Sequence, residues 1–353
     1  MKRTHFILIG LLPIQGLILM LFKKNPSWVE TYYSQLVYPF IFDTHRLFFE
    51  KFSFSVGDLL YAFLVLFIAK NVVSIFKKKK TSWSVIISHS LSFVSLVLLL
   101  FNLNWGLNYY RTPLSQDLVY QMKYNETELE ATFSKLVTIS NQLHSRLSVN
   151  DTTAVTIAYS KATISDLIEK EFDFDLKKMG PKPYLKQSLW STLLSYMGYA
   201  GYLNPFTLES QANSKIPNLD FMITAAHEMA HQLGIASEGE ANFIAFYTSI
   251  KHSDPFVQYA GYTFALRYCY AELYKANPER AKEKIKTLHP GILKNYKELS
   301  EFWKRYQNPF EPLLKKGYDS YLKANGQAKG IQSYSTIVGY VVAYAQKASF
   351  NLN

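Results

Sequence analysis

The sequence predicts a mainly α-helical protein of the α+β class, with transmembrane helices first and then a mostly helical domain with a small β-sheet. Three observations support this prediction. Three apolar runs of membrane-spanning length fall within residues 1–110. Most of the remaining chain repeats its apolar residues at helical spacing. One stretch near residue 200 is instead rich in aromatic residues, Gly and Pro, which favours short strands.

The three apolar runs are expected to form transmembrane helices at about residues 5–22, 57–76 and 83–103. Basic residues precede the first run, as in a signal peptide, but no small-residue cleavage site follows it. We therefore expect an uncleaved anchor. Lys77–Lys80 directly follow the second run and are typical of a cytoplasmic stop.

The basic residues are concentrated near these spans. Residues 1–110 carry 11 Lys and Arg against 4 Asp and Glu, in a chain whose net charge is +11. This distribution favours a lipid bilayer rather than nucleic acid as the partner, and we find no nucleic-acid motif. If the N-terminus and the lysine run are in the cytoplasm, the chain crosses the membrane three times. The residues after the third span then lie outside the cytoplasm. The expected domains are a membrane region, 1–110, and an extracytoplasmic domain, 111–353.

The remaining elements follow in order. Residues 25–56 mix aromatic and single charged residues, which suits either a segment at the membrane interface or an ordinary amphipathic helix. Residues 189–196 fit strand or helix equally, and 199–208 favour a hairpin with Pro205 on an edge strand. Further helices are expected at about 127–147, 161–172, 255–275, 278–287, 291–306, 309–324 and 332–347.

A metal-ligand motif lies in an apolar helix just after the expected hairpin. His227 and His231 are four residues apart, so both imidazoles face one point, and Glu228 lies beside them. This HExxH spacing is the zincin pattern of two zinc ligands and a carboxylate general base. Residues 221–233 are apolar nearly all round, so the helix should be buried, where such polar groups need partners. We therefore expect Zn²⁺ here, with Glu228 as the catalytic residue.

The third zinc ligand is expected in the segment after the motif. Gly234 suits the end of the first helix and Ser237 the start of the next. Ser237 and Glu240 form the S-x-x-E pattern of a capping box, which leaves Glu238 as the favoured ligand and Glu240 as the alternative. Asn242 shares a helix face with Glu238. Its amide oxygen is expected to accept the free N–H of a ligand histidine.

Ser237 stands where a metzincin would carry its third histidine, whereas E-x-x-A-N after HExxH resembles the gluzincin-like pattern, in which the first Glu binds zinc. Four stretches carry a wider resemblance: HEMAHQLG, EGEANFIAF, the upstream GYLNPFT, and WGLNYYR at the membrane exit. Together they make the chain resemble a bacterial family of membrane-anchored HExxH proteins, domain of unknown function 3810. The resemblance covers nearly the whole chain. It supports His227, Glu228 and His231 as the site and implies no particular substrate.

The expected function is that of a zinc metalloprotease, a hydrolase anchored in the bacterial inner membrane with its zincin-like catalytic domain on the periplasmic or extracytoplasmic side. Its substrate would be a peptide or protein, with Glu228 taking a proton from zinc-activated water. Tyr259, Tyr262 and Tyr334 are candidate oxyanion donors, although in a chain with 26 Tyr each is more often a core residue. The alternative is a non-enzymatic membrane-anchored binding or assembly protein that keeps a zinc site. Closed structural sites usually have four ligands, often cysteines, and Cys269 is the only cysteine.

Overall fold

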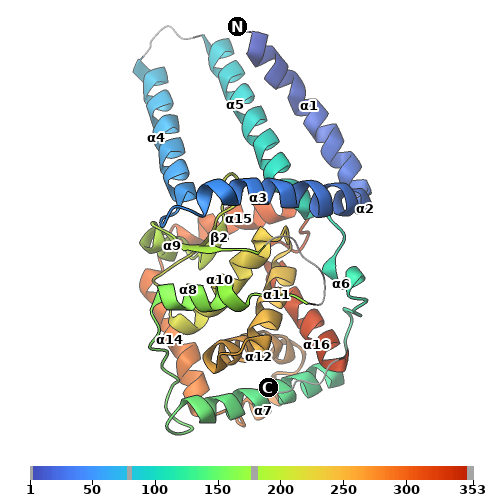
Figure 1. Ribbon diagram of the computed structural model, residues 1–353, viewed down its shortest axis with the longest axis vertical. Helices are drawn as coiled ribbons and strands as arrows, with labels where there is room; N and C mark the ends of the chain where they lie inside the picture. Colours follow the sequence, from blue (N-terminus) through green and yellow to red (C-terminus); the bar gives the residue numbers. More distant parts are fainter. Residues whose placement is uncertain (1–2, 78–81, 176–181, 348–353) are drawn as a thin grey trace. The chain divides into compact units, whose positions relative to one another are not determined.

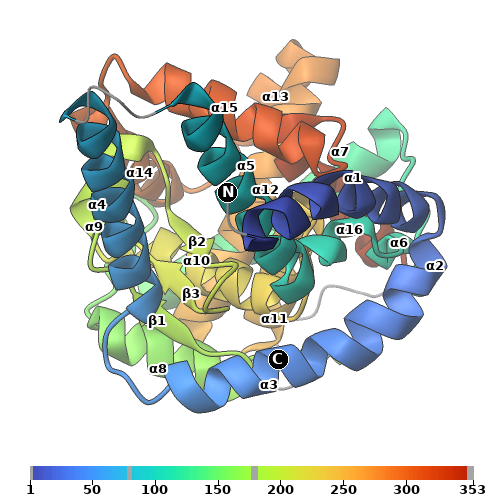
Figure 2. The same cartoon turned by 90° about the horizontal axis from the view of Figure 1, so that it is seen from above.

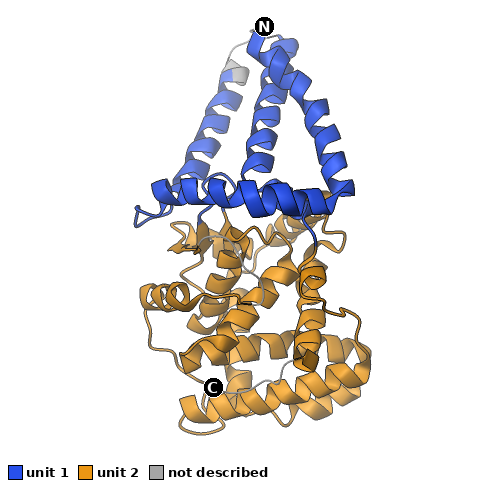
Figure 3. Ribbon diagram, turned by 45° about the vertical axis from the view of Figure 1, so that its right-hand side comes forward, with its two compact units in different colours: residues 1–112, 204–209 blue, residues 113–203, 210–353 orange. Residues whose placement is uncertain are grey.

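The computed structural model describes residues 3–77, 82–175 and 182–347. The chain divides into two compact units (Figure 3). Unit 1 comprises residues 1–112 and 204–209, and unit 2 comprises residues 113–203 and 210–353. Within the expected cytoplasmic stop, Lys78, Lys79 and Lys80 lie outside the described residues.

Unit 1 contains three helices that are long and apolar enough to cross a membrane (Figure 1). They are α1 (Arg3–Lys24), α4 (Val56–Lys77) and α5 (Trp83–Asn104). These helices confirm the three apolar N-terminal helices predicted from sequence. α1 packs against α5, where the buried Ser95 donates a hydrogen bond to the carbonyl oxygen of Leu8. Small hydroxyl residues commonly join helices in this way within membranes.

The segment between the first two spans is largely helical. It forms α2 (Pro26–Trp28), the π-helix η1 (Val29–Val37) and α3 (Tyr38–Phe49). The short 3₁₀ helix η2 (Gly106–Tyr110) follows α5. Glu30 of η1 and Arg111 form a two-bond ion pair with both distances at 2.8 Å, and each side chain is only 8% exposed. Removing one partner of such a buried pair typically costs about 3–5 kcal/mol.

The described residues of unit 2 form helices and one small sheet. Its first helices are α6 (Leu114–Asp117), α7 (Glu126–Leu147) and α8 (Lys161–Glu171). The C-terminal helices are α12 (Pro255–Ala276), α13 (Pro278–Ile285), α14 (Pro290–Tyr306), α15 (Glu311–Ala324), η3 (Gly330–Thr336) and α16 (Ile337–Lys347). Apolar periodicity therefore predicted the long helices of this unit correctly to within a few residues.

The sheet has three short strands, β1 (Leu185–Gln187), β2 (Gly201–Leu203) and β3 (Ser210–Ala212). Their order is β1-β3-β2, and β3 is parallel to β1 and antiparallel to β2. The predicted hairpin is present, but its second strand begins at Ser210. Pro205 lies in the connecting turn, so its placement on an edge strand was wrong. The ambiguous residues 189–196 mostly belong to a helix, α9 (Ser191–Met197).

Helix α10 (Asn218–Gln232) lies in the interior of unit 2. It packs against β3, α8, α12 and α11 (Glu238–Lys251), as Figures 1 and 2 show. Met222, Ala226 and Met229 belong to one hydrophobic core, whereas Ala230 belongs to a second one. Because α10 is apolar on nearly every side, it can be surrounded in this way. The HExxH residues are consequently held inside the unit by the burial of their neighbours.

Candidate metal centre

Three side chains from α10 and the first turn of α11 converge inside unit 2. His227, His231 and Glu238 each offer a ligand atom, and these atoms lie within 4.8 Å of one another. The Glu238 Oε2 atom is 3.2 Å from His227 Nε2 and 3.4 Å from His231 Nε2. Ligands about 2.0–2.1 Å from a tetrahedral zinc ion stand about 3.3–3.4 Å apart. The measured separations therefore fit a zinc ion between these atoms.

The local backbone explains how Glu238 reaches the histidines. One helical turn separates His227 from His231 on the same face of α10. The helix ends just before Gly234, whose φ of 77° is in the left-handed region that favours glycine. Ser237 then precedes α11 as its N-cap residue, as predicted. This short reversal places Glu238, the first residue of α11, beside both imidazoles.

Hydrogen bonds set the orientation of both imidazoles. His227 Nδ1 lies 2.8 Å from Asn242 Oδ1, and His231 Nδ1 lies 2.6 Å from the carbonyl oxygen of Ile235. Because both oxygens accept, each Nδ1 carries a proton and each Nε2 is directed towards Glu238. Asn242 is fixed in turn, since its amide donates to the Tyr334 carbonyl at 3.2 Å. Asn242 therefore has the contact with a ligand histidine that its place on the helix predicted.

The negative charge of Glu238 beside two imidazoles favours the binding of a cation. Burial raises the pKa of Glu238, but the two imidazoles outweigh that effect and keep this pKa well below its usual range. Burial lowers the pKa of His231, but the neighbouring Glu238 carboxylate outweighs it and raises this pKa to about 9. Glu238 Oε2 is buried and faces both Nε2 atoms. Without a metal ion a proton on His231 balances the charge of Glu238, and a divalent metal ion that displaced this proton would have one carboxylate and two imidazole ligands.

Glu228 lies against strand β2. Its Oε2 atom is buried without a hydrogen-bond partner, and burial raises the pKa of its carboxyl group to about 7. A Cβ atom on Gly201 of β2 would stand 2.7 Å from Glu228 Oε1. Glycine at this position therefore gives the carboxylate room beside the strand. Ser210 of β3 donates to the Glu228 carbonyl at 2.7 Å, which joins the sheet to α10.

Two tyrosines complete the surroundings of the cluster. Tyr318 of α15 donates to Glu238 Oε1 at 2.7 Å, and its hydroxyl lies 3.3 Å from that of Tyr334. The Tyr334 ring stacks on the His227 ring with centroids 6.0 Å apart. Burial, followed by the charge of Glu238, raises the pKa of both phenols well above their usual value. Both hydroxyl groups consequently remain protonated and able to donate.

The sequence named only one of these two tyrosines as a candidate, and it gave a core position more weight for that residue. It named Tyr334 but missed Tyr318, which no local pattern distinguishes among 26 Tyr. The other two named tyrosines lie in the core instead. The hydroxyl of Tyr259 donates to Asn295 at 2.9 Å, and Tyr262 is 1% exposed among core side chains.

Glu240 lies on a different side of α11 from Glu238. Its Oε1 accepts hydrogen bonds from the Leu114 amide and the Tyr340 hydroxyl, both at 2.9 Å. Ser237 makes no capping bond with its side chain, so the predicted capping box was wrong. The physical reason is that a buried amide and a buried hydroxyl draw the Glu240 carboxylate inward. The histidines are grouped with Glu238 and not with Glu240.

A pocket of about 400 Å³ opens beside the cluster. Its lining includes His227, Glu228 and the first residue of β2, together with apolar side chains such as Phe264 and Trp303. Such a combination of apolar walls with a few converging polar groups is typical of ligand sites. The pocket and the whole cluster lie within unit 2.

These features define a mainly helical, membrane-associated protein with a buried His–His–Glu cluster beside a pocket. The chain belongs to the family described as protein of unknown function (DUF3810), whose model matches residues 33–342. This match confirms the family that the sequence resembles, and it includes the HExxH segment. No curated protein and no solved structure matches the chain.

Proposed function

We propose that the protein is a membrane-anchored, zinc-dependent metallopeptidase of the zincin type, with a gluzincin-like ligand set. His227, His231 and Glu238 would hold Zn²⁺. The observation that carries the proposal is the buried Glu228 carboxyl group beside this cluster and at the pocket, whose Oε2 atom has no hydrogen-bond partner. Burying such a carboxylate costs free energy, and a purely structural zinc site does not require a general base.

Bound zinc would supply Lewis-acid chemistry, which acidifies water and polarises a carbonyl group. Glu228 accepts a proton from the attacking water as the water oxygen adds to the carbonyl carbon. When the carbon–nitrogen bond breaks, Glu228 delivers that proton to the leaving amine. Tyr334 lines the same pocket and stays protonated, so its hydroxyl is suited to donate to the developing oxyanion, whereas Tyr318 donates its proton to Glu238.

Strand β2 favours an extended peptide or protein segment as the substrate. It is at one end of the strand order, and among the described residues no strand pairs with its outer edge. An extended chain can add to such an edge through main-chain hydrogen bonds while its side chains enter a neighbouring pocket. Gly201 of β2 and Glu228 line one pocket, so a segment bound there would pass the general base.

The proposal is tested by the Glu228→Gln variant, assayed as the full-length chain in detergent against a mixture of peptides. Cleavage should fall at least about 100-fold, because the general base is lost, while the bound zinc and the melting temperature stay unchanged. The matched control is Glu279→Gln on α13, where the side chain is 85% exposed and cleavage should persist. Cleavage by Glu228→Gln at the wild-type rate would refute the proposed mechanism.

A further inference from the structure

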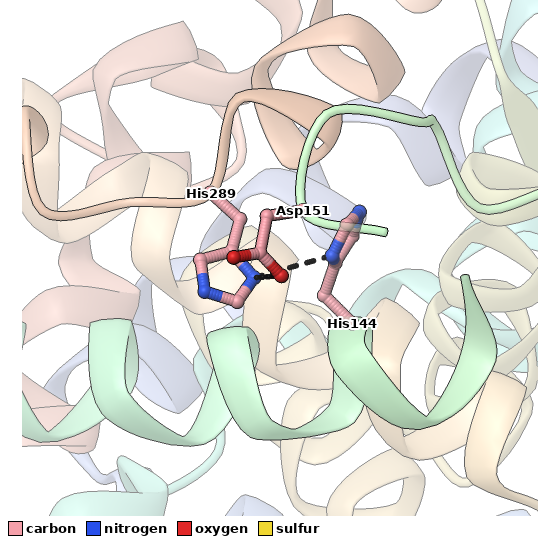
Figure 4. Close-up of side chains that lie close together, drawn as sticks. All are labelled: His144, Asp151 and His289. Atoms are coloured by element: carbon pink, nitrogen blue, oxygen red, sulfur yellow. Dashed lines mark hydrogen bonds and ion pairs between the residues drawn. The ribbon is translucent and has the colours of Figure 1, made fainter. Parts of the chain in front are cut away.

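A second cluster of metal-ligand side chains lies in unit 2, apart from the residues described above. His144 on α7, Asp151 in the turn after it and His289 just before α14 point towards one another (Figure 4). One ligand atom from each lies within 4.8 Å of the others. His144 is fully buried, whereas the Asp151 side chain is 64% exposed. One side of the cluster is therefore open to solvent.

The distances within this cluster suit a tetrahedral metal ion. The Nδ1 atoms of His144 and His289 are 3.3 Å apart, and His289 Nδ1 is 3.5 Å from Asp151 Oδ1. Ligands of a tetrahedral zinc ion stand about 3.3–3.4 Å apart when each is about 2.0–2.1 Å from the metal. Both separations are close to this value, although His144 and His289 are 145 positions apart in sequence.

The buried histidine is fixed in the form that a metal requires. His144 Nε2 lies 2.9 Å from the carbonyl oxygen of Thr153, so Nε2 carries the proton and Nδ1 presents its lone pair to the cluster. Ligand histidines commonly have such a carbonyl partner on the opposite nitrogen.

The backbone around the cluster is held in place by direct contacts. The Gly291 amide donates to the Asp151 carbonyl at 2.9 Å, which ties the turn after α7 to the start of α14. A Cβ atom at Gly291 would stand 2.2 Å from His144 Nε2, so only glycine lets α14 approach the ring. The amide of His289 donates to Asn141 Oδ1 at 2.9 Å. The three ligands are therefore positioned by contacts independent of any ion.

We propose that His144, Asp151 and His289 form a second binding site for a divalent transition-metal ion, with zinc as the ion that best fits two imidazoles and a carboxylate. The ion would replace the proton that the two Nδ1 atoms share, and solvent would occupy the open side. It would fasten α7 to the start of α14. Because Leu299 and Trp303 of α14 line the pocket, this ion would also stabilise one of its walls.

Zinc stoichiometry of the full-length chain in detergent tests the second site. The protein is stripped with a chelator, reloaded with zinc alone at a buffered free concentration, and its zinc content is measured. Wild type should hold two ions, and Asp151→Asn and His289→Gln should each hold one. Asp166→Asn is the matched control, because Asp166 is an exposed residue of α8, and it should hold two. Because Asp151 is exposed, its variant should keep the wild-type helix content.

The His231→Ala variant separates this site from the centre on α10. If both sites bind zinc, His231→Ala should hold one ion. The double variant that carries both His231→Ala and Asp151→Asn should hold none. If wild type holds one ion, and Asp151→Asn and His289→Gln lose it while His231→Ala keeps it, the second site is supported and the first is refuted. Zinc content in Asp151→Asn and His289→Gln equal to wild type would overturn the second site, as would a wild type without zinc.

Discussion

At the residue scale, Glu238 and Glu240 show how two nearby carboxylates acquire different roles. Two residues apart on a helix, their side chains point in directions about 200° apart. Glu238 faces the imidazoles, whereas Glu240 faces Leu114 and Tyr340. Only Glu238 can therefore share a metal ion with the histidines.

We predict that Glu238→Ala loses the zinc bound at this centre and that Glu240→Ala keeps it. Glu240→Ala should instead destabilise the fold by about 1–3 kcal/mol, because the buried amide of Leu114 loses its acceptor. Zinc content and thermal unfolding are measured in the Asp151→Asn background, where only this centre contributes. Glu240→Gln is the control, since it keeps an acceptor oxygen and should recover most of the stability. Loss of zinc in Glu240→Ala alone would reverse the ligand assignment.

The sequence could predict those site residues whose positions depend on local geometry. His227 and His231 are related by helical periodicity, and Glu238 follows them across a short reversal. Tyr318 could not be found in this way, because it lies 80 positions from Glu238 and meets it only through the packing of α15. The same applies to His144 and His289, which only the completed fold brings together.

At the element scale, the start of α8 contains a cation with an unusual environment. Lys161 Nζ donates to the Ile216 carbonyl at 2.5 Å and lies 4.4 Å from the centre of the Phe221 ring. Burial lowers the pKa of Lys161 from 10.5 to about 8, and the charges of Asp220 and Glu298 only partly offset this effect. The folded chain consequently releases this proton at a lower pH than the unfolded chain does.

We predict that this difference makes stability depend on pH between about 8 and 10.5. In that window the unfolded chain binds more protons than the folded chain does, so the free energy of unfolding rises as the pH rises. The cost of burying the charged amine is fully present below pH 8 and is lost by pH 10.5. Relative to Lys161→Met, wild type should gain about 1–3 kcal/mol across this window.

Thermal unfolding of both proteins in detergent at several pH values measures the effect of Lys161. Lys297→Met, at a side chain that is 74% exposed, controls for the general effect of alkaline conditions. A constant difference between wild type and Lys161→Met across the window would contradict the prediction.

The elements differ in how far the sequence predicts them. The long helices of unit 2 have an apolar stripe at helical spacing, so their positions were predicted closely. Each strand has only three residues, and all of β3 is buried, so no alternation of polar and apolar residues marks its register. Residues 189–196 were equally ambiguous, because short apolar runs fit strand and helix alike.

At the scale of the whole molecule, the distribution of basic residues bears on orientation. Lys2, Arg3 and Lys77–Lys80 flank one side of the three spans, against Lys23, Lys24, Arg46 and Lys51 on the other. Basic residues in short loops favour the cytoplasmic side. We propose on this basis that the N-terminus is cytoplasmic and that unit 2 lies on the periplasmic or extracytoplasmic side of the bacterial inner membrane. An extracytoplasmic peptidase would meet peptides and proteins of that compartment.

We predict that alkaline phosphatase fused after residue 353 of the full-length chain is active, because this enzyme folds only outside the cytoplasm, where its disulfides form. The same enzyme fused after Lys80 should be inactive, since the loop between α4 and α5 would be cytoplasmic. Green fluorescent protein fused at the same two sites provides the control and should give the opposite pattern. Replacing Lys77–Lys80 with glutamine should reduce phosphatase activity at residue 353, because the charge difference that holds the loop inside is weakened. Active phosphatase after Lys80 together with an inactive fusion at residue 353 would place unit 2 in the cytoplasm and overturn the proposed location.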